Sequence, residues 1–321
     1  MDEAGVALLV DVGRLLTRRR EFVATPCPAC DSGESLPKFS KNGFDYRQCR
    51  HCETFYVSPR PTPEILEWFY RHSVTYAYWN KHIFPASEQA RREKIFVPRV
   101  DKLLELCVKY AIPMGSLLEV GAGFGTFCAE ISERKRFERV VAVELTPELA
   151  ATCRSRGLET IEEPVEKITV ADSGAYNVIA SFEVIEHLYA PADFLRNALR
   201  LLAPGGLLAL SCPNGCGFDI EVLGTLNSNV DHEHLNYFSP RSLAHLLERC
   251  GFEVLESFTP GRLDADIVRN EALSGRFDLT RQPFLQRVLV NEWDPHGPAF
   301  QDFLVRQGLS SSMWVVARKP R

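Results

Sequence analysis

From about residue 115 onward, short apolar segments of the sequence alternate with segments of helical periodicity. The apolar segments are bounded by turn residues and lie at 116–120, 139–143, 158–161, 177–182 and 206–212. Residues 191–202 repeat apolar side chains at helical spacing, and Pro204-Gly205-Gly206 is expected to end that helix. Strands that alternate with helices form a parallel sheet with helices on both faces. The sequence therefore predicts an α/β fold with a doubly wound sheet.

Length, composition and charge narrow the class of protein further. The 321 residues allow about two domains, and 45% hydrophobic and 25% charged residues are typical of globular chains. A formal net charge of -5 gives no overall positive field for a phosphate backbone. No apolar run reaches the roughly 18 residues of a membrane helix, and the acidic start lacks the basic region of a secretory signal. We expect a cytoplasmic protein with no membrane contact, for which nucleic acid is a minority hypothesis.

The first 60 residues have a character of their own. Residues 2–20 have the periodicity of one helix, and residues 25–60 are rich in Cys, Pro, Gly and Ser. Within this part, Cys27-Pro28-Ala29-Cys30 and Cys49-Arg50-His51-Cys52 have the spacing of two zinc knuckles. Four thiolates leave no open coordination position, so the predicted zinc is structural. We predict that residues 1–60 form an N-terminal helix and a zinc ribbon with ligands Cys27, Cys30, Cys49 and Cys52.

Two helical regions flank the predicted sheet. Residues 61–113 form a helical lead-in, whose aromatic side chains Tyr76, Tyr78 and Trp79 could cover a site as a lid. Residues 114–321 form the sheet domain, with an insertion at about 260–310. This insertion contains Trp293, Phe300 and Phe303, and is interpreted either as a wall of the acceptor site or as a homodimer contact. The sequence does not choose between the two.

A glycine turn follows the strand predicted at 116–120. In Glu119-Val120-Gly121-Ala122-Gly123-Phe124-Gly125 the third glycine comes two residues after the second, so the turn differs from the dinucleotide fingerprint. Glu119 is unsuited to a pyrophosphate and favours a cationic or zwitterionic ligand. Glu144 closes the next strand, where a carboxylate can accept both hydroxyls of a ribose.

Together with 176–188 and Leu202-Ala203-Pro204-Gly205-Gly206, these motifs resemble the class I S-adenosylmethionine-dependent methyltransferases. The resemblance covers roughly residues 115–258, with the last strand at 312–318. It implies a Rossmann-like, doubly wound sheet of seven strands. It also implies a cofactor site in which the glycines line the methionine moiety, Glu144 holds the ribose, and Glu162 or Glu163 lies near the adenine. The implied cofactor-binding residues are Glu119, Gly121, Gly123, Gly125, Glu144, Glu163 and Phe182.

Two polar clusters are candidates for the chemical step. Glu183, Glu186 and His187 follow the fourth strand, and Asp231-His232-Glu233-His234 precedes a helix near Ser239. Glu183, Glu186, His187 and His234 resemble the metal-binding quartet of the small-RNA 3′-terminal ribose methyltransferases, and the first three resemble ubiquinone-pathway O-methyltransferases. The resemblance implies a catalytic divalent cation, Mg²⁺ or Mn²⁺, that acidifies a hydroxyl.

Other roles for these residues stay open. His187 or His234 could act as a base without a metal, or the cluster could bind substrate or serve the structure. His232 could replace His234 in either mechanism.

The zinc ribbon ahead of such a domain resembles an arrangement in bacterial methyltransferases of sugar, polysaccharide and natural-product pathways. Sugar C-methyltransferases of this kind carry a further large C-terminal domain, whereas here only an insertion at about 260–310 precedes the last strand. C-methylation is therefore disfavoured, and we expect transfer to a hydroxyl of a small-molecule acceptor. The acceptor would be a sugar or a natural-product intermediate. RNA ribose 2′-O-methylation is an alternative that the net acidity disfavours. A non-catalytic S-adenosylmethionine- or zinc-dependent interaction module is a second alternative, which Glu119, Glu144, Glu186 and His187 disfavour.

Overall fold

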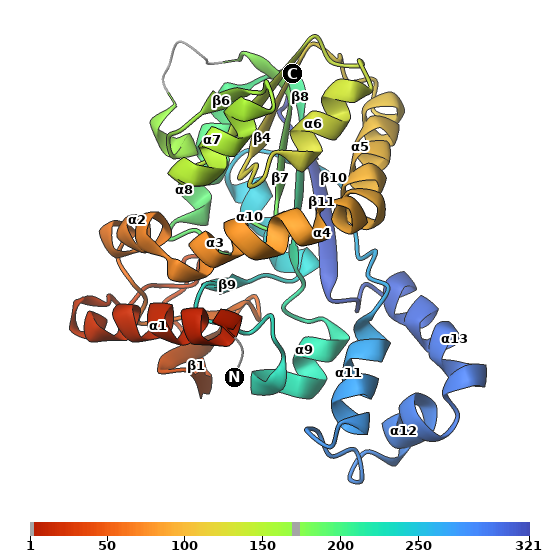
Figure 1. Ribbon diagram of the computed structural model, residues 1–321. Helices are drawn as coiled ribbons and strands as arrows, with labels where there is room; N and C mark the ends of the chain where they lie inside the picture. The colour runs from red at the N-terminus through yellow and green to blue at the C-terminus, as the bar shows by residue number, and fades with distance from the viewer. Residues whose placement is uncertain (1–2, 169–173) are drawn as a thin grey trace.

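The computed structural model describes residues 3–168 and 174–321, which form two sheets and the helices around them (Figure 1). The larger sheet has seven strands in the order β10-β11-β8-β7-β4-β5-β6. Its strands are β4 (Ser116–Val120), β5 (Arg139–Val143), β6 (Glu159–Ile161), β7 (Tyr176–Phe182), β8 (Leu202–Pro213), β10 (Glu253–Phe258) and β11 (Ser312–Arg318). Strands β4 to β8 pair in parallel, whereas β11 is antiparallel to both β8 and β10. This sheet confirms the predicted α/β class and its seven strands.

Alternate residues of the central strands face two different helix layers. Leu117 and Val178 belong to a core shared with α5 (Val97–Lys109) and α6 (Thr126–Glu133). The next residues along these strands pack on the other side, in a core shared with α8 (Pro191–Leu201) and α10 (Pro240–Arg249). Because successive side chains of a strand point to opposite faces, apolar runs without alternation are what such a doubly covered sheet requires.

Two element boundaries differ from the sequence prediction. Strand β8 begins at Leu202, directly after α8, so Pro204-Gly205-Gly206 lies inside the strand. Gly205 has φ +76°, and the pairing with β7 shifts register there, which lets the chain bend without ending the strand. The predicted helix 2–20 is divided into α1 (Glu3–Thr17) and a 3₁₀ turn (Arg19–Glu21). Residues 1–2 and 169–173 lie outside the described part of the chain.

The smaller sheet lies beside the four predicted zinc ligands, of which Cys49 ends one of its strands and the other three lie outside the strands. Its antiparallel strands are β1 (Ser35–Lys41), β2 (Phe44–Cys49), β3 (Phe55–Val57) and β9 (Asn236–Tyr237), in that order. Strand β9 follows α9 (Phe218–Leu223) and therefore comes after strands β4 to β8 of the large sheet in sequence. The ribbon is thus completed by two residues that lie well beyond the predicted boundary at residue 60.

The lead-in is helical, as predicted, and crosses one end of the large sheet (Figure 1). It consists of α2 (Pro63–His72), α3 (Val74–Tyr78), a π-helical turn (Trp79–Ile83), α4 (Phe84–Arg91), a second π-helical turn (Arg92–Phe96) and α5. The buried carboxylate of Asp11 in α1 accepts hydrogen bonds from the backbone of Val74 and Thr75 and from the Ser73 hydroxyl. The N-terminal helix therefore anchors the first turn of α3.

The insertion forms a separate helical group beside α9 (Figure 1). It comprises α11 (Asp264–Leu273), α12 (Pro283–Gln286), a π-helical turn (Arg287–Asn291) and α13 (Trp293–Arg306). Phe300 packs edge-to-face on Phe218 of α9, whereas Phe303 is half exposed. Among the described residues, no helix combines the length and apolar character needed to cross a bilayer.

Candidate active site

The glycine turn between β4 and α6 has a backbone that only glycine adopts easily. Gly121 has φ +77° and Gly125 has φ +73°. A Cβ on Gly121 would lie 2.4 Å from Val184 Cγ2, so the turn approaches the loop after β7 too closely for any side chain. The N–H groups of Gly121 and Ala122 donate to the carbonyl of Val143, which fixes the turn against the end of β5.

Glu144 lies at the carboxyl end of β5 and is 7% exposed. Its two oxygens accept hydrogen bonds from the backbone N–H groups of Gly123 (2.7 Å) and Thr146 (2.8 Å). Burial raises the pKa of this carboxyl above its ordinary value, and the backbone hydrogen bonds oppose that shift. The protein thus holds Glu144 in place against the glycine turn before any ligand binds.

A cavity of about 270 Å³ lies along the carboxyl edge of the large sheet. Gly121, Gly123 and Glu144 line one side, and Tyr70 and His187 line another. Other residues in its wall are Tyr76, Phe84, Val120, Val143, Leu145, Thr146, Leu149, Glu163, Pro164, Val165, Glu183, Val184 and Leu188. Of the two glutamates expected near an adenine, Glu163 lines this cavity and Glu162 instead pairs with Arg154.

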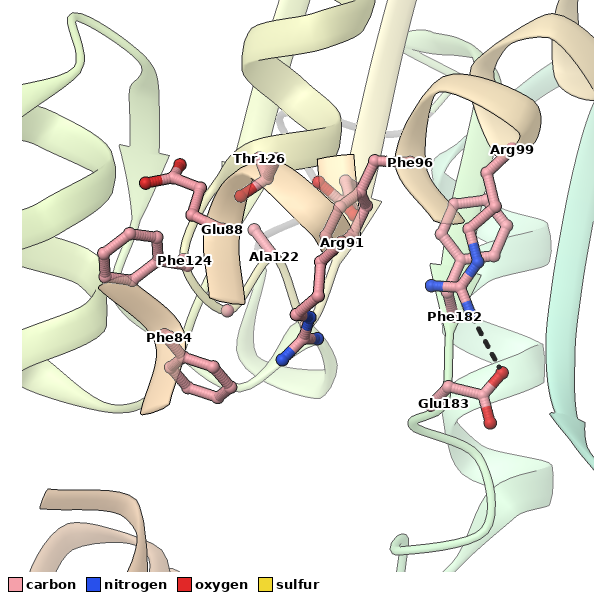
Figure 2. A pocket seen from close by; sticks show the side chains of 13 residues that line it. Phe84, Glu88, Arg91, Phe96, Arg99, Ala122, Phe124, Thr126, Phe182 and Glu183 are labelled. Carbon is pink, nitrogen blue, oxygen red and sulfur yellow. Dashed lines mark hydrogen bonds and ion pairs between the residues drawn. The ribbon is translucent and has the colours of Figure 1, made fainter. Parts of the chain in front are cut away.

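A second cavity, of about 180 Å³, adjoins the first and shares Phe84, Gly121, Gly123 and Glu183 with it (Figure 2). Its further lining residues are Glu88, Arg91, Phe96, Arg99, Glu119, Ala122, Phe124, Thr126 and Phe182. The structure therefore brings six of the seven predicted cofactor-binding residues to the walls of two joined cavities. The seventh, Gly125, lies just behind them and begins α6 in a left-handed conformation.

Glu119 is the most enclosed carboxylate of the second cavity, at 3% exposure. The Cys128 thiol donates a hydrogen bond to its Oε2 at 3.0 Å. Burial raises the pKa of Glu119 to about 8. A cationic group of a ligand in this cavity would favour the ionised form of Glu119.

Two arginines of the lead-in were not singled out from the sequence. Arg99 lies 4.9 Å from the centre of the Phe182 ring and 3.2 Å from Glu183 Oε1 (Figure 2). Arg91 lies over Phe84 and Phe96, and the described residues offer it no ion pair. Their spacing of eight residues, about two helical turns, was the available signal, because it places both side chains on one face.

The aromatic lid was predicted from three residues, and one of them reaches the cavities. Tyr76 lines the larger cavity, and its hydroxyl donates to Glu233 Oε2 at 2.7 Å. Tyr78 instead stacks on His82, and Trp79 is 39% exposed. Neither of these two side chains lines either of the two cavities, although Trp79 packs edge-to-face on Tyr76 and Phe84.

Glu186, His187 and His234 lie together, and His187 is the one of the three that lines the larger cavity. One potential ligand atom from each lies within 4.8 Å of the others. Glu186 is 1% exposed, and neither of its oxygens has a hydrogen-bond partner among the described residues. Burial, followed by the charge of Glu183, raises the pKa of Glu186 well above its ordinary value. An unpartnered buried carboxyl is costly, so this arrangement favours a bound group beside it.

Glu183 is separated from this group, contrary to the predicted quartet. Its backbone stands in the left-handed region at φ +57°. Its Oε1 accepts hydrogen bonds from the Ser211 hydroxyl (2.6 Å) and from Arg99 (3.2 Å), which hold the side chain between the two cavities. The structure thus groups three of the four quartet residues.

The two histidines of the group are oriented by backbone carbonyls. His187 Nδ1 lies 3.2 Å from the carbonyl of Glu233, and His234 Nδ1 lies 2.7 Å from the carbonyl of Asn229. Since a carbonyl only accepts, each Nδ1 carries the hydrogen and each Nε2 keeps its lone pair. Burial and the neighbouring His234 lower the pKa of His187 well below its ordinary value. Both rings can therefore accept a proton or coordinate a cation.

His232 does not take the place of His234. It is 2% exposed, packs against Phe44 and Phe69, and lines neither cavity. Tyr70 is a further residue that the sequence did not indicate, and Glu233 belongs to the predicted Asp231–His234 cluster without a predicted role of its own. The Tyr70 hydroxyl is buried without a partner among the described residues, and its ring faces His187. Burial raises the pKa of Glu233 to about 8.

The four cysteines of the ribbon converge on one point. Sγ of Cys27 lies 3.4 Å from Sγ of Cys52, and Sγ of Cys30 lies 3.5 Å from Sγ of Cys49. All four sulfur atoms lie within 4.8 Å of one another. The cysteines outside the ribbon are free thiols, and Cys107, Cys128, Cys153, Cys212 and Cys250 are buried.

Comparisons with known proteins identify relatives of the central part of the chain. Residues 88–257 match a family described as a methyltransferase domain. The ubiquinone biosynthesis O-methyltransferase of Xanthomonas oryzae pv. oryzae is 28% identical over 151 residues, which are 43% of this chain and 62% of the relative. The same enzyme of Xanthomonas axonopodis pv. citri is 28% identical over 156 residues, or 44% of this chain and 64% of the relative. The chain thus spans less than two thirds of these curated relatives.

Among solved structures, one similar chain belongs to the complex between the Haloferax volcanii Trm112 methyltransferase activator and a methyltransferase. The superposition has a TM-score of 0.51 at 14% identity, and the matched part covers 77% of this chain and 98% of the similar chain. At this identity the similarity shows the shared fold.

Proposed function

The chain belongs to the methyltransferase-domain family, and from this premise we propose that it transfers a methyl group from S-adenosylmethionine to a hydroxyl of a small-molecule acceptor. The acceptor class we propose is a sugar or a natural-product intermediate. One observation carries the proposal. The glycine turn and Glu144 line the same cavity as His187, so a cofactor site and a candidate base open onto one space. The O-methyltransferase relatives support transfer to oxygen.

The donor set of the two cavities fits S-adenosylmethionine. Glu144 is placed to accept the ribose hydroxyls, and the glycine turn leaves room for the backbone of the methionine moiety. In the second cavity, Glu119 matches an ammonium group, and Arg91 matches a carboxylate. When bound, S-adenosylmethionine supplies an electrophilic methyl group on a sulfonium ion. Phe84 and Tyr76 limit the access of water to that part of the cavity.

The acceptor hydroxyl has to lose its proton as the new bond forms. His187 Nε2 is the atom best placed to take it, because Nδ1 is held by the carbonyl of Glu233 and the ring lines the cavity. His234 packs edge-to-face on His187 with ring centres 4.6 Å apart, which fixes the orientation of the pair.

A divalent cation at Glu186, His187 and His234 is a second form of the same proposal. The unpartnered carboxyl of Glu186 and the two free Nε2 atoms fit such an ion. When bound, Mg²⁺ or Mn²⁺ would acidify a coordinated hydroxyl. Glu183 would complete the set only by leaving Ser211 and Arg99.

The proposal is tested with the purified full chain. S-adenosylhomocysteine should bind in calorimetry at one site per chain, and labelled S-adenosylmethionine should transfer its methyl group to a hydroxyl compound of a cell extract. Chelation followed by addition of Mg²⁺ or Mn²⁺ separates the two forms, since only the cation form loses and regains turnover. Tight binding of NAD in place of S-adenosylhomocysteine would contradict the cofactor assignment. Methyl transfer to RNA alone would contradict the acceptor class.

We also propose that Cys27, Cys30, Cys49 and Cys52 hold one structural zinc. In a tetrahedron with Zn–S bonds of about 2.3 Å, neighbouring sulfur atoms lie about 3.8 Å apart, close to the separations of 3.4 and 3.5 Å between the cysteine pairs. Metal analysis of the folded protein should give about one zinc per chain. Cys49→Ser should lower folding yield, whereas Cys250→Ser, at a buried thiol outside the ribbon, should keep the zinc. A folded, zinc-free protein with four titratable ribbon thiols would exclude this site.

A further inference from the structure

The side chain of Asn236, in the two-residue strand β9, is fully enclosed at 1% exposure. Its Nδ2 lies within hydrogen-bond distance of three carbonyl oxygens of the loop after β7: those of Leu188 (2.8 Å), Ile185 (3.2 Å) and Glu186 (3.2 Å). The backbone N–H groups of Leu235 and Asn236 also donate to the Glu186 carbonyl. A segment of the ribbon sheet therefore satisfies the carbonyls of the turn that carries Glu186 and His187.

Arg60 holds Asn236 from the other side. Its guanidinium is 1% exposed, and the described residues give it no acidic partner. It donates to Asn236 Oδ1 (2.9 Å) and to the carbonyls of Val57 (2.9 Å), Tyr189 (3.2 Å) and Leu235 (3.3 Å). Burying this cation costs free energy, because none of the four oxygens that accept its hydrogen bonds carries a charge to offset its desolvation. A simple ribbon-to-domain contact could be made more cheaply by apolar side chains.

We infer that Arg60 and Asn236 are positioning residues that fix the Glu186–His187 turn from the ribbon sheet. Arg60 orients the Asn236 amide through Oδ1, and the amide NH₂ then holds the carbonyls of residues 185, 186 and 188. The ribbon thereby sets the place of His187 relative to the cavity without touching the cofactor. This inference rests on the proposed function in one respect, that His187 acts on the acceptor. It assigns the ribbon a role in the rate of the reaction.

The most direct test is Asn236→Asp in the full chain with S-adenosylhomocysteine bound. Aspartate keeps an oxygen for Arg60 and removes the NH₂ donors to the turn. Hydrogen–deuterium exchange of the backbone amides of residues 184–188 should become about ten-fold faster, because the hydrogen bonds that hold the turn are lost. Affinity for S-adenosylhomocysteine should stay within about two-fold of the wild type. Initial rates with labelled S-adenosylmethionine and the hydroxyl compound that the wild type methylates in the cell extract should show kcat about ten-fold lower with KM for the cofactor unchanged.

Arg60→Lys is the second variant, and it also serves if Asn236→Asp does not fold. Lysine keeps the charge but not the planar fork, so we expect an intermediate effect on exchange and kcat. Arg47→Ala is the matched control, because Arg47 lies on β2 and bonds only within the ribbon, to Ser35. Unchanged turn exchange in a folded Asn236→Asp, or an equal effect of Arg47→Ala, would overturn the inference. If the wild type methylates no hydroxyl compound, the proposed function fails, and the exchange data still decide the role of Asn236.

Discussion

The two halves of the site differ in how their carboxylates are satisfied. On the proposed cofactor side, Glu144 accepts two backbone hydrogen bonds, which hold it where we propose that the ribose binds. On the acceptor side, Glu186 is buried with no partner among the described residues, beside two imidazoles that each keep a free Nε2. The carboxyl of the first half is thus held by the protein itself, whereas the carboxyl of the second half has no hydrogen-bond partner among the described residues. The second half is therefore where we propose that the acceptor or a cation binds.

This contrast predicts that the largest effect on rate comes from His187. His187→Ala should lower turnover by roughly 10²- to 10⁴-fold, since a positioned base or ligand is lost. Affinity for S-adenosylhomocysteine should change by less than about two-fold, because Glu144 and the glycine turn are untouched. Single-turnover rates and calorimetry measure the two quantities. Near-normal turnover in both His187→Ala and His234→Ala would end the contrast, leaving proximity and orientation as the source of rate.

Glu119 should govern the pH dependence of stability on the cofactor side. Its pKa of about 8 in the folded protein exceeds the ordinary value of 4.5. The folded state therefore binds this proton more tightly than the unfolded state, and its contribution to the free energy of unfolding is complete below pH 4.5. That contribution is lost as the pH rises from about 4.5 to about 8, at up to about 1.4 kcal/mol per pH unit. In urea unfolding without ligand, Glu119→Gln should therefore gain stability relative to the wild type as the pH rises. Parallel pH profiles for the two proteins would show that Glu119 does not titrate in this range.

Glu144→Ala sharpens the contrast from the recognition side. Removal of a charged hydrogen-bond acceptor should cost roughly 1.5 to 3 kcal/mol of binding free energy, which lowers affinity for S-adenosylhomocysteine about ten-fold or more. The rate at saturating cofactor should change far less. Glu162→Ala, at a surface glutamate paired with Arg154, is the control and should leave affinity unaltered. Equal affinities of Glu144→Ala and the wild type would remove Glu144 from the site.

Arg91 should have the smallest of these effects. Arg91→Met keeps the packing against Phe84 and Phe96 but loses the cation, and should weaken S-adenosylhomocysteine about five-fold. Methylthioadenosine, which lacks the amino-acid part, should bind the variant and the wild type alike. An equal loss for both ligands would mean that Arg91 supports the cavity wall rather than a carboxylate.

The parts of the fold that the sequence predicts are those that depend on a short stretch of neighbouring residues. Leu117–Val120 and Val140–Val143 are apolar runs bounded by turns, and they form central strands because both of their faces are covered. Strand β9 has two residues and forms through its pairing with β3. Two residues are too few to show the periodicity of a strand, so the local sequence does not predict it. Pro204-Gly205-Gly206 predicts the end of a helix, whereas strand β8 has already begun at Leu202, which pairs with Tyr176 of β7.

The site residues also fall into those that the local sequence predicts and those that depend on contacts between distant parts of the chain. The glycine turn and Glu144 follow from spacing along two adjacent strands, whose carboxyl ends meet at one edge. The separation of Glu183 from Glu186 does not, because it results from one left-handed residue and from Ser211 on the neighbouring strand. The buried guanidinium of Arg60 is equally hidden in sequence, where an arginine is expected to face water.

The pairing of β3 with β9 has a consequence for the order in which the chain folds. Phe55 pairs with Tyr237, and their rings stack with centres 4.1 Å apart, although most of the large sheet is synthesised between them. Strands β1 to β3 can form a local meander as soon as they leave the ribosome, but their fourth strand arrives only after β8. Closing so long a loop is entropically costly and slow compared with local contacts. The ribbon sheet is thus the first to begin, but its fourth strand is synthesised only after strands β4 to β8 of the large sheet.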